Sequence, residues 1–303
     1  MSAGTVSGKW VWYLAAIAGT FIMATLGAFV RQVSPGNEYA IALGRFGIGF
    51  VCLAGLRALG RERAGARASG VSWARAAAGL SLALFVVAYF KAVQSGTLAN
   101  AAFLLYLGPL IASTLAALWL EEGFDRTSGL LLGCAVLGTV FITEFKLPSG
   151  AEQVESLVFG LLSGLFYGLF LLFNNPKLQG GESSSDNTFA QLGIASLVML
   201  PVVAASGASL SGADLAWIGA VGVLHGFVAL TLVIAALRFL KTIEYGTISY
   251  GEPVIAALIG ALAYHERISA LQLIGCALVF AAGIARIVIA ANVPREAEHG
   301  TGG

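Results

Sequence analysis

Tyr106-Leu-Gly-Pro109 and Tyr250-Gly-Glu-Pro253 are two copies of one short motif, and each is followed by a second shared stretch. That stretch reads Leu132-Gly-Cys-Ala135 after the first copy and Ile274-Gly-Cys-Ala277 after the second. The prolines are 253 − 109 = 144 residues apart and the cysteines 276 − 134 = 142 apart, which fits a loop two residues shorter in the second copy. The pattern predicts a two-fold internal repeat, each copy spanning about half of the 303 residues.

The sequence around these motifs is too apolar for a protein surrounded by water. Hydrophobic residues make up 58% of the chain and charged residues 11%, with a mean hydropathy of +0.86. A soluble domain carries about 25% charged residues, so most of this surface is expected to face lipid. The net charge of +1, without a basic run interleaved with aromatic residues, argues against a nucleic-acid partner.

The spacing of the cysteines and the absence of a nucleotide-binding motif argue against a disulfide scaffold, a metal site and a nucleotide site. Cys52, Cys134 and Cys276 lie inside apolar stretches and show neither Cys-x-x-Cys nor Cys/His metal spacing. The sequence contains no Gly-x-x-x-x-Gly-Lys-Ser/Thr loop that would bind a nucleoside triphosphate. We therefore expect no disulfide scaffold, no metal and no cofactor.

Apolar runs of about 20 residues, the length that crosses a bilayer, predict an all-α integral membrane protein with ten transmembrane helices. The runs are expected at 10–30, 39–59, 73–94, 97–119, 128–146, 156–174, 188–206, 214–237, 245–264 and 269–291. The first is long for the core of a signal peptide, so we interpret it as an uncleaved span. Five helices fall in each copy, which places the first repeat at 1–147 and the second, with a short C-terminal tail, at 148–303.

The distribution of lysine and arginine predicts the orientation in the membrane. Arginines are concentrated between the helices expected at 39–59 and 73–94, and Arg238 and Lys241 lie between those at 214–237 and 245–264. Cytoplasmic loops are rich in these residues, so both termini are expected in the cytoplasm. Because five is an odd number, the second repeat must enter the membrane from the opposite side. Inverted repeats of this kind are typical of alternating-access transporters.

At this point the sequence resembles a known family. The segment 89–122, which contains the first Tyr-x-x-Pro motif and ends on Glu121-Glu122, is similar to the EamA-type repeat of the drug/metabolite transporter superfamily. The segment 236–266, which ends on His265-Glu266, is similar to the same repeat. The resemblance covers nearly the whole chain and implies a ten-helix carrier whose cavity is lined mainly by the first, third, fourth, sixth, eighth and ninth helices. The glutamates at the ends of the two segments, Glu121, Glu122 and Glu266, are interpreted as solvated helix ends or interhelix latches.

The chain also looks like the YddG aromatic amino acid exporters, a structural type within that superfamily. This resemblance implies export of amino acids and related compounds across a bacterial cytoplasmic membrane. The second half departs from the first in the helices expected at 156–174 and 188–206, where similarity between the repeats is weak, and Arg45 has no basic counterpart there.

Pro109 and Pro253 are the candidate hinges. Each removes a backbone donor and favours a kink, which would free the carbonyls of Leu105 and Ser249, four residues earlier. The kinks are either packing features or hinges that line a watery cavity. Glu252 is a further candidate, because it lies in the second copy of this motif where the first copy has Gly108. It is either a hydrogen-bonded carboxyl, a proton carrier or a partner for a substrate ammonium group.

The remaining candidates for substrate binding are polar or aromatic side chains expected near the middle of the membrane. They are Tyr89, Asn100, Tyr106, Tyr167, His225, Ser249 and Tyr250. Tyrosine combines an apolar face with a hydrogen-bonding tip, which suits an aromatic ligand, although each of these side chains also fits simple packing. Lys91 and Arg45 are expected toward the outer ends of their helices, where they either snorkel to the interface or attract a substrate carboxylate at the mouth.

The glycines are expected to act in packing rather than in binding. Gly219, Gly222 and Gly226 surround His225 in the helix expected at 214–237. Gly160, Gly164 and Gly168 share one face of the helix expected at 156–174. Small residues let membrane helices approach closely, so both sets predict tight helix contacts.

These features favour a secondary-active or facilitative carrier of small metabolites, with proton coupling left open. Amino acid export, aromatic substrates favoured, is the first hypothesis, and phosphorylated sugars or nucleosides are alternative solutes. An intramembrane enzyme or lipid-handling protein would need a nucleophile with a base or an acidic metal cluster, and no such motif is found. A channel would favour a multimer with charged rings, whereas the repeat favours a monomer in the lipid bilayer.

Overall fold

The computed structural model describes residues 6–60, 72–95, 98–122, 125–143, 151–180, 183–265 and 268–292, and within these ranges it contains helices and no strands. The helices are α1 (Val6–Ala24), α2 (Leu26–Val30), α3 (Glu38–Ala58), α4 (Trp73–Ser95), α5 (Leu98–Leu105), α6 (Gly108–Trp119), α7 (Arg126–Thr143), α8 (Ala151–Phe173), α9 (Pro176–Gln179), α10 (Ser184–Ser206), α11 (Gly212–Val221), the π-helix η1 (Gly222–Ala229), α12 (Leu230–Phe239), α13 (Thr242–Ser249), α14 (Gly251–Tyr264) and α15 (Ala270–Asn292).

Seven helical segments in the described ranges are long and apolar enough to cross a membrane. They are Trp10–Val30, Glu38–Ala58, Trp73–Ser95, Val154–Phe173, Ser184–Ser206, Gly212–Phe239 and Thr242–Ala263. Three shorter apolar helices, Gly108–Trp119, Arg126–Ile142 and Ala270–Ala285, lie where the other expected spans were placed. The expected span at 97–119 falls short because it is divided into α5 and α6.

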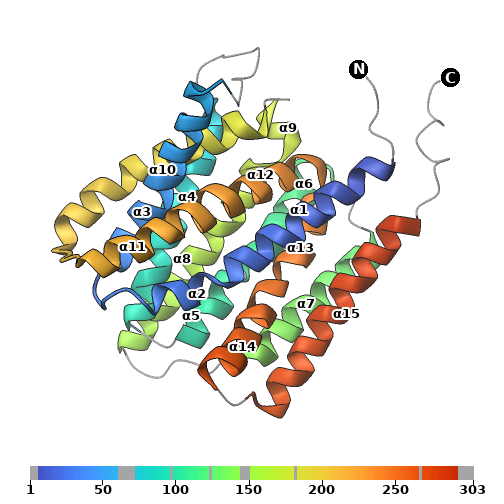
Figure 1. The fold of residues 1–303 in the computed structure, drawn as a ribbon. Helices are drawn as coiled ribbons and strands as arrows, with labels where there is room; N and C mark the ends of the chain where they lie inside the picture. Colours follow the sequence, from blue (N-terminus) through green and yellow to red (C-terminus); the bar gives the residue numbers. More distant parts are fainter. Residues whose placement is uncertain are drawn as a thin grey trace.

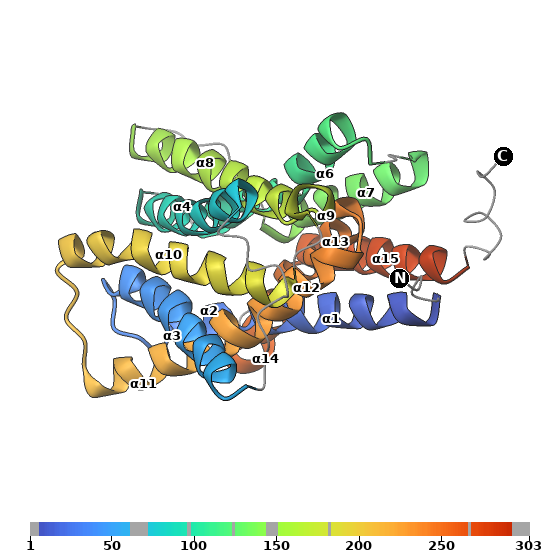
Figure 2. The ribbon, with the colours of Figure 1, turned by 90° about the horizontal axis from the view of Figure 1, so that it is seen from above.

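The helices form one bundle, and many neighbours in space are far apart in the sequence. Figures 1 and 2 show α4 beside α8 and α7 beside α15, and these are the two most extensive helix contacts among the described residues. On another side α3 packs against η1 and α10, and α1 packs against α12. The start of α1 and the end of α15 lie at the same end of the bundle (Figures 1 and 2).

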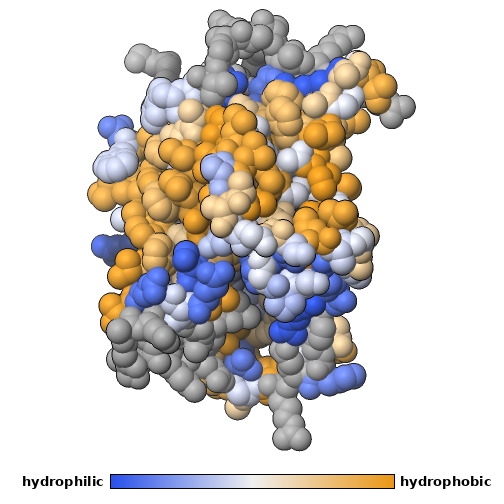
Figure 3. Space-filling model, turned by 90° about the vertical axis from the view of Figure 1, so that its left-hand side faces the viewer, coloured by the Kyte–Doolittle hydropathy of each residue, from blue (hydrophilic) through white to orange (hydrophobic). Residues whose placement is uncertain are grey.

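The outside of the bundle is apolar. Large hydrophobic side chains on it include Leu262, which is 79% exposed, and Leu197, which is 67% exposed. Figure 3 shows a broad hydrophobic area across one side of the molecule, with hydrophilic residues gathered toward its two ends. Contiguous apolar surface of this extent is unstable in water and suits the hydrocarbon core of a bilayer.

Two helices are interrupted at the repeated Tyr-x-x-Pro motif. The first break separates α5 from α6 at Tyr106 and Leu107, and the second separates α13 from α14 at Tyr250. Pro109 and Pro253 therefore lie in the first turn of the following helix. A proline costs little there, because a first-turn N–H has no partner within its own helix.

The far ends of the two interrupted helices also match. Glu121 after α6 has φ 51° and His265 after α14 has φ 54°, and these are the non-glycine residues with positive φ in the described ranges. They are 265 − 121 = 144 residues apart, the spacing of the two prolines. Equivalent positions thus share a left-handed backbone conformation that L-residues rarely adopt. The expected boundary between the repeats, 147–148, lies outside the described residues.

The glycine sets pack as expected, except for Gly219. A Cβ on Gly226 would lie 1.7 Å from the carbonyl oxygen of Arg45, and one on Gly222 would lie 2.5 Å from the Cβ of Ile48. On the other side of the bundle, a Cβ on Gly164 would contact the carbonyl oxygen of Leu104. These contacts confirm close approach of η1 to α3 and of α8 to the α5–α6 pair.

Candidate functional site

The two helix breaks meet through their tyrosines. The Tyr250 hydroxyl donates a 2.6 Å hydrogen bond to the carbonyl oxygen of Tyr106, and the two ring centroids are 6.4 Å apart. The Tyr106 hydroxyl donates in turn to Oε2 of Glu252 at 3.4 Å. An exact two-fold relation would direct the Tyr106 hydroxyl to the carbonyl of Tyr250. The acid at Glu252, which replaces the glycine of the first copy, takes that hydrogen bond instead.

A side chain from the second helix break, that of Tyr250, therefore hydrogen-bonds the backbone of the first break. Sequence reasoning predicted free carbonyls at Leu105 and Ser249, whereas the tyrosine hydroxyl binds the carbonyl one residue further, on Tyr106. The chain turns at Tyr106 and Leu107, so the carbonyl of Tyr106 leaves the helical hydrogen-bond pattern. The carbonyl of Tyr106 is partly buried and needs a partner, and Tyr250, 1% exposed, is positioned to provide one.

Removal of the Tyr250 hydroxyl tests this arrangement. We expect Tyr250→Phe to lower the free energy of unfolding by about 1 kcal/mol, because it leaves a partly buried carbonyl without its hydrogen bond while keeping the ring. The measurement is thermal unfolding of the detergent-solubilised protein. Tyr89→Phe is the matched control, since the Tyr89 hydroxyl has no hydrogen-bond partner among the described residues. Equal stability of the two variants would contradict the prediction.

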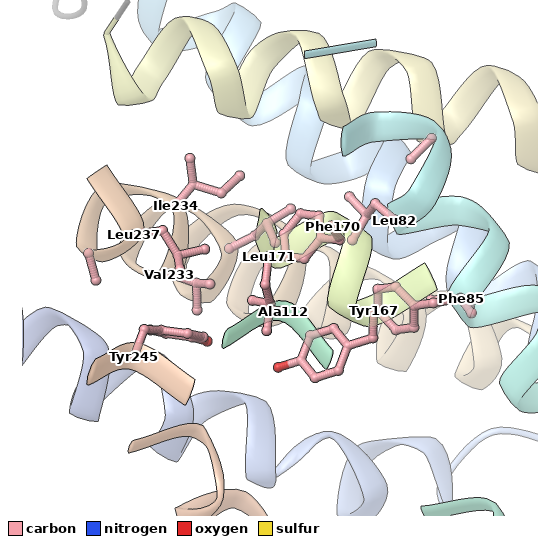
Figure 4. Close-up of a cluster of buried hydrophobic side chains, with 14 of the residues drawn as sticks. Leu82, Phe85, Ala112, Tyr167, Phe170, Leu171, Val233, Ile234, Leu237 and Tyr245 are labelled. Carbon is pink, nitrogen blue, oxygen red and sulfur yellow. The ribbon is translucent and has the colours of Figure 1, made fainter. Parts of the chain in front are cut away.

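A second aromatic group lies beside the breaks. Tyr167 on α8 packs against Phe85 of α4, with ring centroids 5.3 Å apart, and against Phe170. Figure 4 shows the hydroxyl of Tyr167 directed toward that of Tyr245 on α13, in a shell of apolar side chains. Sequence reasoning missed Tyr245, because nothing in its local pattern distinguishes it from a packing residue.

Arg45 points into the bundle. It is 8% exposed, and its Nη2 lies 3.0 Å from the sulfur of Met23 on α1. It lies within electrostatic range of Glu252. Of the two interpretations of Arg45, snorkelling to the interface is wrong, because the side chain is buried. Arg45 lies on the buried face of α3, which is pressed against η1 at Gly226.

His225 connects η1 to the break between α1 and α2. Its Nε2 lies 3.0 Å from the Thr25 hydroxyl, which itself donates to the carbonyl of Ile22 at 2.7 Å. The ring also packs edge-on against Phe29. Short π-helices often occur at functional sites, and here the π-helix places His225 on a helix junction.

The other residues predicted for the site are dispersed. Tyr89 on α4 is half-buried, with its ring centroid 6.0 Å from that of Phe90. The Ser249 hydroxyl is buried and donates to the carbonyl of Gly246. Lys91 is exposed at the surface. The side chain of Asn100 lies outside the described part of the structure. Among the described residues, no group of three His, Cys, Asp or Glu side chains could hold a metal ion.

Polar contacts close one end of the bundle between elements distant in sequence. Glu122 after α6 accepts hydrogen bonds from Nδ2 of Asn175 at 2.6 Å and from the backbone N–H of Thr242 at 3.1 Å. At the same end Arg57 of α3 pairs with Asp186 of α10 at 2.8 Å. The interpretation of Glu122 as an interhelix latch agrees with these contacts, but its partners could not be read from the sequence.

The opposite end is joined by a different set of groups. Asp214 accepts hydrogen bonds from the backbone N–H groups of Ser34 and Ser211, both at 2.8 Å. Asn37 exchanges two hydrogen bonds with the backbone of Ser209. These contacts tie the loop before α3 to the loop before α11.

Comparison with known proteins agrees with this architecture. The chain matches the EamA-like transporter family twice, at residues 10–144 and 155–288. It is 28% identical to an uncharacterized transporter of Archaeoglobus fulgidus over 88% of this chain and 93% of that one. It is 24% identical to the uncharacterized transporter YxxF of Bacillus subtilis over 68% of this chain and 66% of that one.

A crystal structure described only as that of a protein has the same fold. Its TM-score is 0.79 at 17% identity, and the match covers 92% of this chain and 99% of that chain. The two family matches together span most of the sequence, and the helices are apolar enough to cross a membrane several times. This chain belongs to the EamA-like transporter family and is a multi-pass membrane transporter.

Proposed function

We propose that this transporter moves small metabolites by alternating access, as a secondary-active or facilitative carrier, and that it exports amino acids, aromatic ones in particular. The main support is the meeting of the two helix breaks at Tyr106, Tyr250 and Glu252. Interrupted helices that meet between repeats are where secondary transporters bind their substrates. Aromatic rings with hydroxyl tips suit an amphipathic aromatic solute.

The proposed topology has ten spans in two inverted repeats, 1–147 and 148–303, with both termini in the cytoplasm of a bacterial cell. It is supported by equivalent helix contacts. The contact of α1 with α12 has its counterpart in that of α8 with α4, and the contact of α3 with η1 has its counterpart in that of α10 with α4. The candidate site is built from one chain, which supports a functional monomer.

Counterflow in proteoliposomes tests the carrier. Vesicles loaded with unlabelled amino acid should accumulate labelled amino acid from outside, with a rate that saturates and with aromatic amino acids exchanged fastest. Protein-free vesicles are the control. Flux that does not saturate would identify a channel and contradict the proposal, and exchange confined to phosphorylated sugars or nucleosides would replace the substrate class.

A further inference from the structure

We propose that Arg45 and Glu252 bind the two opposite charges of a zwitterionic substrate, with the guanidinium holding its carboxylate and the Glu252 carboxylate holding its ammonium group. This inference rests on the proposed function and names the chemistry that the site selects.

Arg45 has hydrogen-bond donors to spare. A guanidinium carries five N–H donors, and the contact to the Met23 sulfur uses one of them on a weak acceptor. Its Nε has no hydrogen-bond partner within the described part of the chain. A buried arginine is normally paired with a carboxylate or satisfied by several hydrogen bonds. The remaining donors form a planar fork, which matches the two oxygens of a carboxylate.

Glu252 has acceptor capacity in reserve as well. A carboxylate offers about four lone-pair sites, and among the described residues Glu252 is contacted by a single donor, the Tyr106 hydroxyl, at the long distance of 3.4 Å. Its side chain is half-buried, whereas Arg45 is buried. An ammonium group can therefore reach this carboxylate while Tyr106 still donates to it.

Arg45 and Glu252 lie near each other but are not in contact. They are within electrostatic range, yet they form no direct ion pair in the described structure. α3 is locked to η1 where Gly226 meets the Arg45 carbonyl, and Glu252 is held in the first turn of α14 next to Pro253. Two fixed, separated charges of opposite sign are complementary to a zwitterion.

The surroundings favour an aromatic side chain on that zwitterion. Tyr106 contacts Glu252 directly, and Tyr167 packs against Phe85 of α4 and Phe170 of α8 beside the breaks. Tyr106 lies in the break itself and Tyr167 lies on α8, which packs against both helices that flank the break, so their rings offer flat apolar surface near the charged groups.

Three ligands with the same ring test the inference in counterflow competition. L-Phenylalanine carries both charges, 3-phenylpropionate lacks the ammonium group and 2-phenylethylamine lacks the carboxylate. We expect each truncated ligand to inhibit with an affinity about tenfold or more below that of phenylalanine, the effect of one charged hydrogen-bonded contact. Equal inhibition by the three would overturn the inference. A protein that exchanges only uncharged solutes would also overturn it, with the proposed carrier intact, whereas absence of saturable flux of any solute would contradict both.

Charge-removing variants assign each contact. Arg45→Gln should lower the affinity for phenylalanine and for phenylpropionate by about tenfold and leave the affinity for phenylethylamine unchanged. Glu252→Gln should lower the affinity for phenylalanine and for phenylethylamine and leave the affinity for phenylpropionate unchanged. Arg126→Gln, at an exposed position at the start of α7, is the control and should leave the affinity for all three ligands unchanged. A folded variant that loses affinity equally for all three ligands would contradict the assignment of each substrate charge to its residue. Size-exclusion profiles report folding, and the ligand series with the unaltered protein decides the question if a variant does not fold.

Discussion

Gly226→Ala should lower the free energy of unfolding by about 3 kcal/mol or more, because overpacking against backbone leaves no flexible atom to yield. The new Cβ would lie 1.7 Å from the carbonyl oxygen of Arg45, far inside van der Waals contact. Relief requires η1 and α3 to separate, which would also move Arg45 away from Met23 and Glu252. The expected result is loss of a monodisperse peak in size-exclusion chromatography after mild heating.

Gly219→Ala is the matched control for this prediction. Gly219 lies one segment earlier on the same long helical stretch, and a Cβ there would meet nothing within 4 Å. Alanine is favoured over glycine inside a helix by about 1 kcal/mol, so this variant should be as stable as the parent or slightly more stable. Equal destabilisation by both substitutions would show that the contact of η1 with α3 is looser than described.

Glu122→Ala should lower the free energy of unfolding by about 2–3 kcal/mol, because one carboxylate satisfies an amide side chain and the first N–H of α13. Its partners Asn175 and Thr242 are both buried. Removing the carboxylate leaves the Thr242 N–H and one hydrogen of the Asn175 amide unpaired at the junction of α6, α9 and α13, while Asn175 still donates to the Thr242 hydroxyl at 3.1 Å. Thermal unfolding in detergent, monitored by intrinsic fluorescence, measures the loss.

The neighbouring glutamate should respond in the opposite direction. Glu121 is exposed and adopts φ 51°, where a residue with a Cβ is strained. Glu121→Gly should therefore raise stability by about 1 kcal/mol, since glycine is the preferred residue at such a helix end. Loss of stability in Glu121→Gly, or none in Glu122→Ala, would contradict the assignment of the latch to Glu122.

Local patterns in the sequence were sufficient to predict where the helices lie and where two of them are interrupted. Apolar runs mark the membrane-spanning segments, because lipid contact imposes a minimum length and excludes charge. The repeated Tyr-x-x-Pro motif marks the breaks, because proline cannot donate within a helix. Comparison of Glu252 with Gly108 identified where the two copies differ, and it is there that the Tyr106 hydroxyl is diverted to a carboxylate.

Contacts between distant segments were beyond the reach of such patterns. Arg45 looked like an interfacial cation, yet which face of α3 is buried depends on η1, about 180 residues later in the chain. Tyr245 and Met23 carry no motif and enter the site through helix packing. The partners of Glu122 lie 53 and 120 residues away.

The sequence by itself therefore determined the membrane environment, the duplication and the positions of the helix breaks, since these follow from hydropathy and from the backbone chemistry of proline. Only the tertiary structure decided that Arg45 faces inward, that Tyr250 closes the break at Tyr106, and that Arg45 and Glu252 lie near each other without an ion pair among the described residues. Those features depend on how helices far apart in the chain pack together, and packing is set by the shapes of both partners rather than by either one alone.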